Sequence, residues 1–226
     1  MKESWVIPPE ANAEFVCQME DILQLYTRPY DPDYPLVCFD ETSKQLISEV
    51  REPLPPEPGQ VERYDYEYKR EGVCNIFMMF EPLVGWRHAE VTDQRTQIDY
   101  AQQIKYLVDE CYPHAKKIQL AQDNLNTHVR ASLYKAFPPD EARRILDKIE
   151  FHYTPKHGSW LNMAEIELSV LNRQCLDRRI AEKEVLKQEI AAWEKRRNEL
   201  SCKVDWQFTT QDARIKLKRL YPSISS

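Results

Sequence analysis

Two aspartates stand directly after apolar runs that have the pattern of buried strands. Asp40 follows Leu36–Phe39, and Asp123 follows the run Lys117–Gln122. Short apolar runs bounded by turn-forming residues predict buried strands, so each aspartate is expected at the tip of a strand. If the two strands are neighbours in one sheet, the carboxylates emerge side by side at the edge where α/β sheets place ligand sites. A lone aspartate at a strand end more often starts a turn or caps a helix, so a third acid is needed.

That third acid lies in the segment Tyr153–Glu167, where a loop leads into a helix that carries both Glu165 and Glu167. Helical periodicity does not decide between these two glutamates, because apolar residues flank each of them. Glu41 is likewise a rival of Asp40. Convergent carboxylates are the hard oxygen ligands that a divalent cation requires. The three acids together therefore indicate a divalent-cation site.

Several motifs together carry a resemblance to a known family. They are Cys-Phe-Asp-Glu at Cys38–Glu41, Gln-Asp-Asn-Leu-Asn-Thr-His at Gln122–His128, the long segment Tyr153–Glu167, and the closing Phe208–Arg214. From about residue 5 to residue 221, the chain closely resembles the catalytic domain of bacterial insertion-sequence transposases of the Tc/mariner superfamily. These are DDE transposases, and their fold is ribonuclease-H-like.

The resemblance implies a catalytic and metal-binding triad. It maps to Asp40, Asp123 and Glu165, the last of which stands three positions after Asn162 in a Leu-Asn-x-x-Glu pattern. The implied activity is cleavage of DNA strands followed by strand transfer through a 3′-hydroxyl. Two Mg²⁺ ions about 3.5–4 Å apart would serve both steps, with Asp40 shared between them. Mn²⁺ should substitute for Mg²⁺, since its ligand preference is similar.

Further residues are expected to support the triad or to contact DNA. They are Glu41, Asn124, His128, Lys156, His157, Trp160 and Asn162. His128, expected one helical turn beyond Asn124, is predicted either to orient a water or phosphate or to be satisfied by backbone. Trp160 can stack on a base, although core packing is the commoner role of such a residue. Arg178 and Arg179 join Lys156 as candidate phosphate contacts.

The order of predicted elements defines the fold class. Helical spacing predicts a helix in 10–26, and the predicted order thereafter is three strands, helix, strand, helices, strand and helix, from residues 36–39, 73–80, 86–91, 96–111, 117–122, 125–147, 149–153 and 160–175. This order predicts an α/β fold with a mixed five-stranded sheet flanked by helices, ribonuclease-H-like by resemblance, with a helical C-terminal extension. We expect three parts: an N-terminal helix and linker in 1–32, the catalytic domain in 33–176 and a mildly basic extension in 177–226.

Charge is distributed unevenly over the 226 residues, whose formal net charge is −6. Residues 171–226 hold 13 Lys and Arg against 8 Asp and Glu, a net of +5, which leaves 18 against 29 and a net of −11 for residues 1–170. The acidic excess fits a cation-binding core, and the basic end fits nucleic acid. The six cysteines lack a zinc-site spacing and are expected as free thiols. No apolar stretch is long enough to span a bilayer and no signal peptide is evident, so a cytoplasmic, nucleoid-associated protein without a membrane partner is expected.

The expected partners are DNA, as transposon ends and as target, and a second copy of the chain in an active homo-oligomer. A single helix before the first strand cannot form a helix-turn-helix, so we expect the N-terminal DNA-recognition domain to be missing and DNA binding to be weak, salt-sensitive and blind to sequence. Two other functions stay open. One is a ribonuclease-H-type nuclease, and the other is a catalytically idle or domesticated transposon remnant that binds DNA or another protein.

Overall fold

A computed structural model describes residues 7–8, 10–61, 63 and 65–223. Its helices and strands are α1 Ala13–Tyr26, β1 Leu36–Glu49, β2 Tyr68–Glu81, β3 Trp86–Thr92, α2 Gln97–Tyr106, η1 Leu107–Cys111, β4 Ile118–Gln122, α3 Ala131–Ala136, α4 Pro139–Asp147, β5 Ile149–Tyr153, η2 Ser159–Leu161, α5 Met163–Leu171, η3 Asn172–Leu176, α6 Lys183–Glu199, α7 Thr210–Lys216 and η4 Lys218–Leu220. No helix in these ranges is long and apolar enough to cross a membrane.

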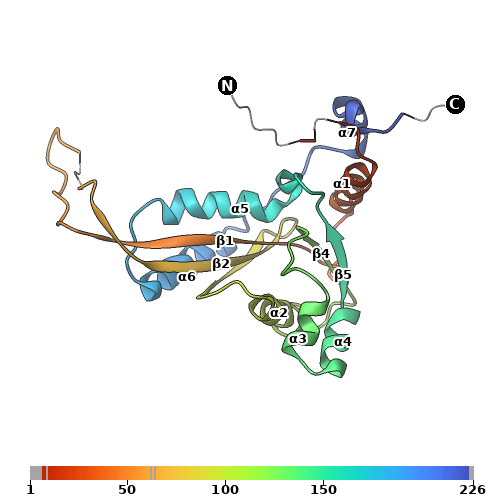
Figure 1. Cartoon of the computed structure of the whole chain (residues 1–226), viewed down its shortest axis with the longest axis horizontal. Coiled ribbons are helices and arrows are strands. Elements are labelled where there is room, and N and C mark those ends of the chain that lie inside the picture. The colour runs from red at the N-terminus through yellow and green to blue at the C-terminus, as the bar shows by residue number, and fades with distance from the viewer. Residues whose placement is uncertain (1–6, 9, 62, 64, 224–226) are drawn as a thin grey trace.

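One mixed sheet of five strands, in the order β3-β2-β1-β4-β5, forms the centre of the molecule (Figure 1). The three N-terminal strands form an antiparallel meander, and β4 and β5 continue the sheet in parallel with β1. The predicted α/β class and the mixed five-stranded sheet with flanking helices are confirmed. The pairing of β1 with β4, which brings the two aspartates to neighbouring strands, is present as well.

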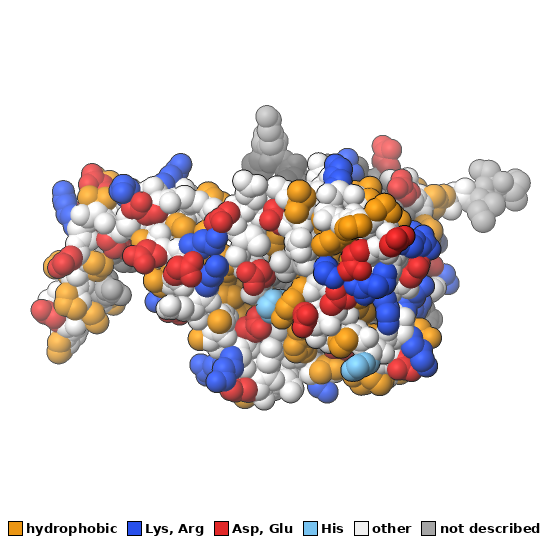
Figure 2. Space-filling model, turned by 90° about the horizontal axis from the view of Figure 1, so that it is seen from below, with side chains coloured by type: hydrophobic (Ala, Val, Ile, Leu, Met, Phe, Trp, Pro, Cys, Tyr) orange, Lys and Arg blue, Asp and Glu red, His pale blue; other side chains and the backbone are white. Residues whose placement is uncertain are grey.

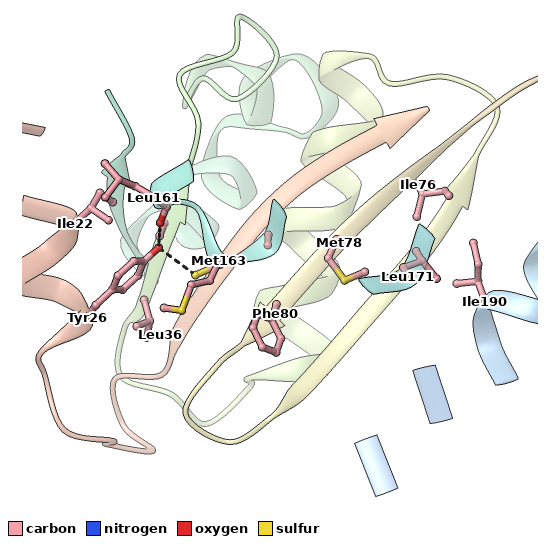
Figure 3. Packing of buried hydrophobic residues seen from close by; sticks show 14 of the residues in the cluster. Ile22, Tyr26, Leu36, Ile76, Met78, Phe80, Leu161, Met163, Leu171 and Ile190 are labelled. Atoms are coloured by element: carbon pink, nitrogen blue, oxygen red, sulfur yellow. Dashed lines mark hydrogen bonds between the residues drawn. The ribbon is translucent and has the colours of Figure 1, made fainter. Parts of the chain in front are cut away.

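The two faces of the sheet pack against different helices. Alternate residues of a strand point to opposite faces, so Leu36 and Cys38 join one core with α1, α5 and α6, while Val37 and Phe39 join another with α2, α3 and α4. Figure 3 shows the first core, in which the Tyr26 hydroxyl donates to the carbonyl of Leu161 at 2.6 Å. This bond holds α1 against the segment that leads into α5.

β1 is much longer than the sequence indicates, and this corrects one prediction. The strand continues to Glu49 in antiparallel pairing with β2, so Asp40 lies within the strand rather than at its tip. The residues from Asp40 to Gln45 are polar, so this part of the strand lacks the apolar pattern of a buried strand, and most of it is only partly buried. Beyond Glu49, the proline-rich segment forms an arm that projects from the body (Figure 1), with isolated bridges such as Leu54 to Arg63.

A second correction concerns the segment between β4 and α3. Residues 123–130 form turns instead of the predicted start of a helix, so His128 does not lie one helical turn after Asn124. The Asp123 carboxylate accepts from the backbone N–H of Leu125 at 3.2 Å, and such a side-chain turn competes with helix formation. Pro138 and Pro139 divide the helical part of this segment, because α3 ends at Ala136 and α4 begins at Pro139.

Candidate active site

The alternation of β1 sends its two neighbouring acids to opposite faces of the sheet. Asp40 follows Leu36 and Cys38 onto the face covered by α5, whereas Glu41 follows Phe39 onto the face covered by α2 and α3. Glu41 therefore cannot replace Asp40 without a shift of the strand register. This geometry separates the two rivals that the sequence left side by side.

Asp40 is a buried carboxylic acid with no cationic partner in the described part of the chain. Its oxygens accept from the backbone N–H of Glu41 at 2.8 Å and from the Asn162 amide at 3.2 Å. Burial raises the pKa of Asp40 to about 8, and the charges of Asp123 and Glu165 add to that rise. Burial and the neighbouring acids therefore favour the protonated form of Asp40 in the metal-free chain.

Asn162 connects the helix that carries Glu165 to the strand that carries Asp40. It is the N-cap of α5, with its side-chain oxygen accepting from the backbone N–H of Ala164 at 3.1 Å. Its amide nitrogen donates to the carbonyl of Phe39 at 2.9 Å as well as to Asp40. One fully buried amide thus fixes the first turn of α5 against β1, and Glu165 lies in that turn.

Glu165 faces the same cluster of acids. Burial raises its pKa, a hydrogen bond from Ser159 opposes the rise, and the charge of Asp123 raises it further. The loop that precedes α5 turns tightly, with the Gly158 N–H donating to the Pro155 carbonyl at 2.8 Å. A Cβ at Gly158 would lie 2.5 Å from the Pro155 ring, so this close approach requires glycine.

Asp123 is held from the other face of the sheet by His128. The His128 Nδ1 lies 2.5 Å from an Asp123 oxygen, and its Nε2 lies 2.8 Å from a Glu41 oxygen. The imidazole ring is fully buried between two aromatic rings. It meets the Phe39 ring edge-on, and its centroid lies 4.8 Å from that of the tilted Tyr100 ring. His128 is therefore satisfied by two carboxylates, not by backbone.

The charge of His128 balances the two acids that it bridges. Burial by itself lowers the pKa of His128, but hydrogen bonds to Asp123 and Glu41 and their charges outweigh burial and raise it to about 9. Arg95 adds a second cation on this face, 3.7 Å from Glu41. The Tyr100 hydroxyl donates to the side-chain oxygen of Gln122, whose amide nitrogen donates to the carbonyl of His128. Sequence reasoning missed Arg95, Tyr100 and Gln122.

Glu167, the other glutamate of α5, is engaged by arginines away from the cluster of acids. It is fully buried, and its carboxylate accepts from Arg197 at 2.6 and 3.1 Å and lies 2.9 Å from Arg87 Nε. Two guanidinium groups neutralise it, one from β3 and one from α6. Of the two glutamates on α5, only Glu165 faces the other acids.

The remaining predicted residues occupy more peripheral positions. Asn124, Lys156 and His157 are exposed around the acids, on the loops after β4 and β5. Trp160 packs against Trp206, with ring centroids 6.5 Å apart, at the edge of the core under α1. Trp160 is thus a core-packing residue, although its buried Nε1 has no hydrogen-bond partner within the described residues.

The donor set suits a hard divalent cation, but the side chains do not yet converge on one. Within the described ranges, no three His, Cys, Asp or Glu side chains stand close enough to hold a metal ion. Asp123 is turned onto His128, and its side chain is 36% exposed, whereas the side chains of His128 and Glu41 are buried. The three acids fit Mg²⁺ by chemistry, because all are oxygen donors, and the charge of Asp123 contributes to the raised pKa of both Asp40 and Glu165 in the absence of a cation.

The mixed five-stranded sheet, with one acid on β1, one directly after β4 and one on α5, has a ribonuclease-H-like architecture. A sequence model of the DDE superfamily endonuclease family matches residues 35–187. The chain belongs to this family. A comparison with curated proteins finds no match.

Solved structures of the Mos1 mariner transposase share the fold. The paired end complex with Mn has a TM-score of 0.57 at 17% identity, over 89% of this chain and 61% of the Mos1 chain. The strand transfer complex has a TM-score of 0.59 at 14% identity, over 89% and 60%. The catalytic domain alone has a TM-score of 0.55 at 12% identity, over 88% of this chain and 96% of that one. The chain therefore spans about three fifths of the Mos1 chain in the DNA complexes.

Proposed function

We propose that this chain is a DNA transposase catalytic domain that cleaves DNA strands and joins a 3′-hydroxyl end to target DNA. The observation that carries the proposal is that Asp40, Asp123 and Glu165 come from neighbouring elements and lie near enough for charge to act between them, while none of the three pairs with a Lys or Arg in the described structure. Family membership supports the endonuclease chemistry, and the similar Mos1 paired-end complex with the left transposon end supports DNA as the partner.

Asp40, Asp123 and Glu165 are the proposed metal ligands, with Asp40 shared. When bound, a pair of Mg²⁺ or Mn²⁺ ions lowers the pKa of the attacking hydroxyl and stabilises the leaving oxygen. Paired end complexes of Mos1 with Mn and with Mg support the use of both metals here. The residues of this chain do the positioning: Asn162 orients Asp40, and His128 retains one oxygen of Asp123 while the other remains available.

The finer assignments belong to the same proposal. We assign the chain to the bacterial insertion-sequence branch of the Tc/mariner superfamily, with residues 33–176 as the catalytic unit. The active form is a homo-oligomer on DNA in the nucleoid. Exposed Asn124, Lys156 and His157 stand around the acids, where they can contact the scissile strand.

Metal-dependent nicking of supercoiled plasmid tests the enzymatic part. The wild-type chain is expected to nick DNA with Mg²⁺ or Mn²⁺ and not with chelator, and Asp123→Ala should lose the activity. Asp147→Ala, which removes an exposed aspartate on α4, is the matched control and should retain it. Absence of nicking by a folded wild-type chain would leave the binding-protein alternative.

Strand transfer separates a transposase from a ribonuclease. A labelled DNA with a pre-cut 3′-hydroxyl end is incubated with the protein, metal and a target plasmid, and covalent joining is scored on a denaturing gel. Cleavage of RNA in RNA–DNA hybrids without any joining would favour the ribonuclease-H-type alternative.

A further inference from the structure

A hollow lined by arginines lies between η3 and α6, separate from the catalytic acids. Its volume is about 730 Å³, and four arginines line it against two acids: Arg173, Arg178, Arg196 and Arg197, with Asp177 and Glu189. The two segments run side by side, joined by the Trp193 indole N–H to the Gln174 side chain at 3.1 Å. This hydrogen bond holds the two segments that line the hollow together, and arginines predominate among its charged lining residues.

The four arginines are not equally available. Arg178 pairs with Glu189 at 2.6 Å, and Arg197 is committed to the buried Glu167. Arg173 and Arg196 are exposed, and neither forms an ion pair with a carboxylate in the described part of the chain. Two guanidinium groups thus face the hollow with their charge uncompensated.

We infer that this hollow is a binding site for backbone phosphates of DNA, outside the catalytic acids. The inference rests on the proposed function for its partner. The guanidinium group matches phosphate oxygens in a bidentate geometry and is less strongly hydrated than an ammonium, so free arginines in a hollow favour phosphate. The hollow also lies in the part of the chain where the net charge is +5, whereas residues 1–170 carry −11.

The position of the hollow suits a duplex that enters the catalytic site. Arg173 follows Glu165 by eight residues along α5 and η3, which corresponds to about 12 Å of helix. One turn of DNA is about 34 Å long, so a duplex with a phosphate at the acids reaches the hollow within a turn. Contacts there hold DNA without reading its sequence, because they are made to the backbone. By contrast, the face over α2, α3 and α4 shows acidic and basic side chains interspersed (Figure 2).

Salt-dependent binding of a fluorescent duplex, measured by anisotropy in chelator, tests this site without cleavage. Each phosphate contact contributes about 0.9 to the slope of log K against log salt concentration. The double variant R173Q/R196Q is expected to lower the slope by about two and to weaken binding about tenfold or more at low salt. Arg143→Gln, an exposed arginine on α4, is the matched control and should lower neither. Thermal unfolding of each variant verifies the fold.

An unchanged slope in the folded double variant would overturn the phosphate site, and so would a wild-type chain that binds no duplex. In the same preparations, plasmid nicking tests the proposed function alone, so the two proposals can fail separately.

Binding of polyglutamate tests whether the hollow binds an acidic protein segment instead. If the double variant loses polyglutamate binding and keeps duplex binding, the hollow takes an acidic protein segment and the inference is wrong.

Discussion

Carboxylates of opposite electrostatic character lie one or two residues apart in two places. On β1, Asp40 faces other acids while Glu41 faces His128 and Arg95, and on α5, Glu165 faces acids while Glu167 is bound by Arg87 and Arg197. Only the identity of the packed face differs within each pair. One acid of each pair lies near other acids, and the other acid forms ion pairs that hold its strand or helix in place.

The largest expected effect is on cleavage. Asp40→Asn, Asp123→Asn and Glu165→Gln should each reduce plasmid nicking to background while leaving the protein folded, since each amide keeps the shape of the acid and removes a proposed metal ligand. Nicking rates and thermal unfolding of the three variants provide the measurement. A variant that still nicks at the wild-type rate removes that residue from the triad.

The bracing acids should behave in the opposite way. Glu167→Gln should lower the free energy of unfolding by about 3–5 kcal/mol, because it leaves two guanidinium groups without their shared partner in the interior. Glu165→Gln, two residues away on the same helix, is the control and should cost little stability. Equal losses in urea unfolding of the two variants would refute the comparison.

Stability of the metal-free protein should fall with pH because of Asp40. The folded-state pKa of about 8 lies above the ordinary value of 3.8, so the folded state retains a proton that the unfolded state releases. The contribution is fully present below pH 4 and is lost as the pH rises toward 8. Between pH 4 and 6.5, below the range where His128 titrates, the wild type should lose roughly 3 kcal/mol relative to Asp40→Asn. Parallel stability curves of the two proteins would contradict this.

The smallest predicted effect concerns His128. His128→Asn should weaken Mn²⁺ binding or slow nicking by about 10–100-fold, as expected when the partner that orients a metal ligand is removed. Titration of metal into the protein by calorimetry and the metal dependence of nicking measure it. His114→Asn, at an exposed histidine, serves as the control. Unaltered metal affinity would assign His128 to packing alone.

Sequence reasoning captured what local pattern determines. The apolar runs at Leu36–Phe39 and Lys117–Gln122 predicted two strands, because buried parallel strands are short and apolar, and the structure pairs these strands as neighbours. The class of fold followed from the order of the elements. The helical segments around α5 and α6 were also predicted, with ends displaced by a few residues.

What sequence reasoning could not supply depends on contacts between distant segments. The ion-pair partners of Glu41 and Glu167 lie about 30 to 90 residues away in the chain, and the periodic spacing of apolar residues within a strand or helix does not reveal them. The long polar half of β1 is a strand only because β2 pairs with it. The role of Glu41 had one usable signal: strand alternation places it on the face opposite Asp40.

The alternation of β1 also constrains how this gene can change. Deleting or inserting one residue between Leu36 and Asp40 would rotate every later side chain of the strand to the other face and exchange the acids at positions 40 and 41. Chain length in this stretch is therefore as restricted as residue identity. After the register shift between Leu46 and Ile47, where the strands already accommodate an irregularity, the projecting arm can gain or lose residues without reaching the acids.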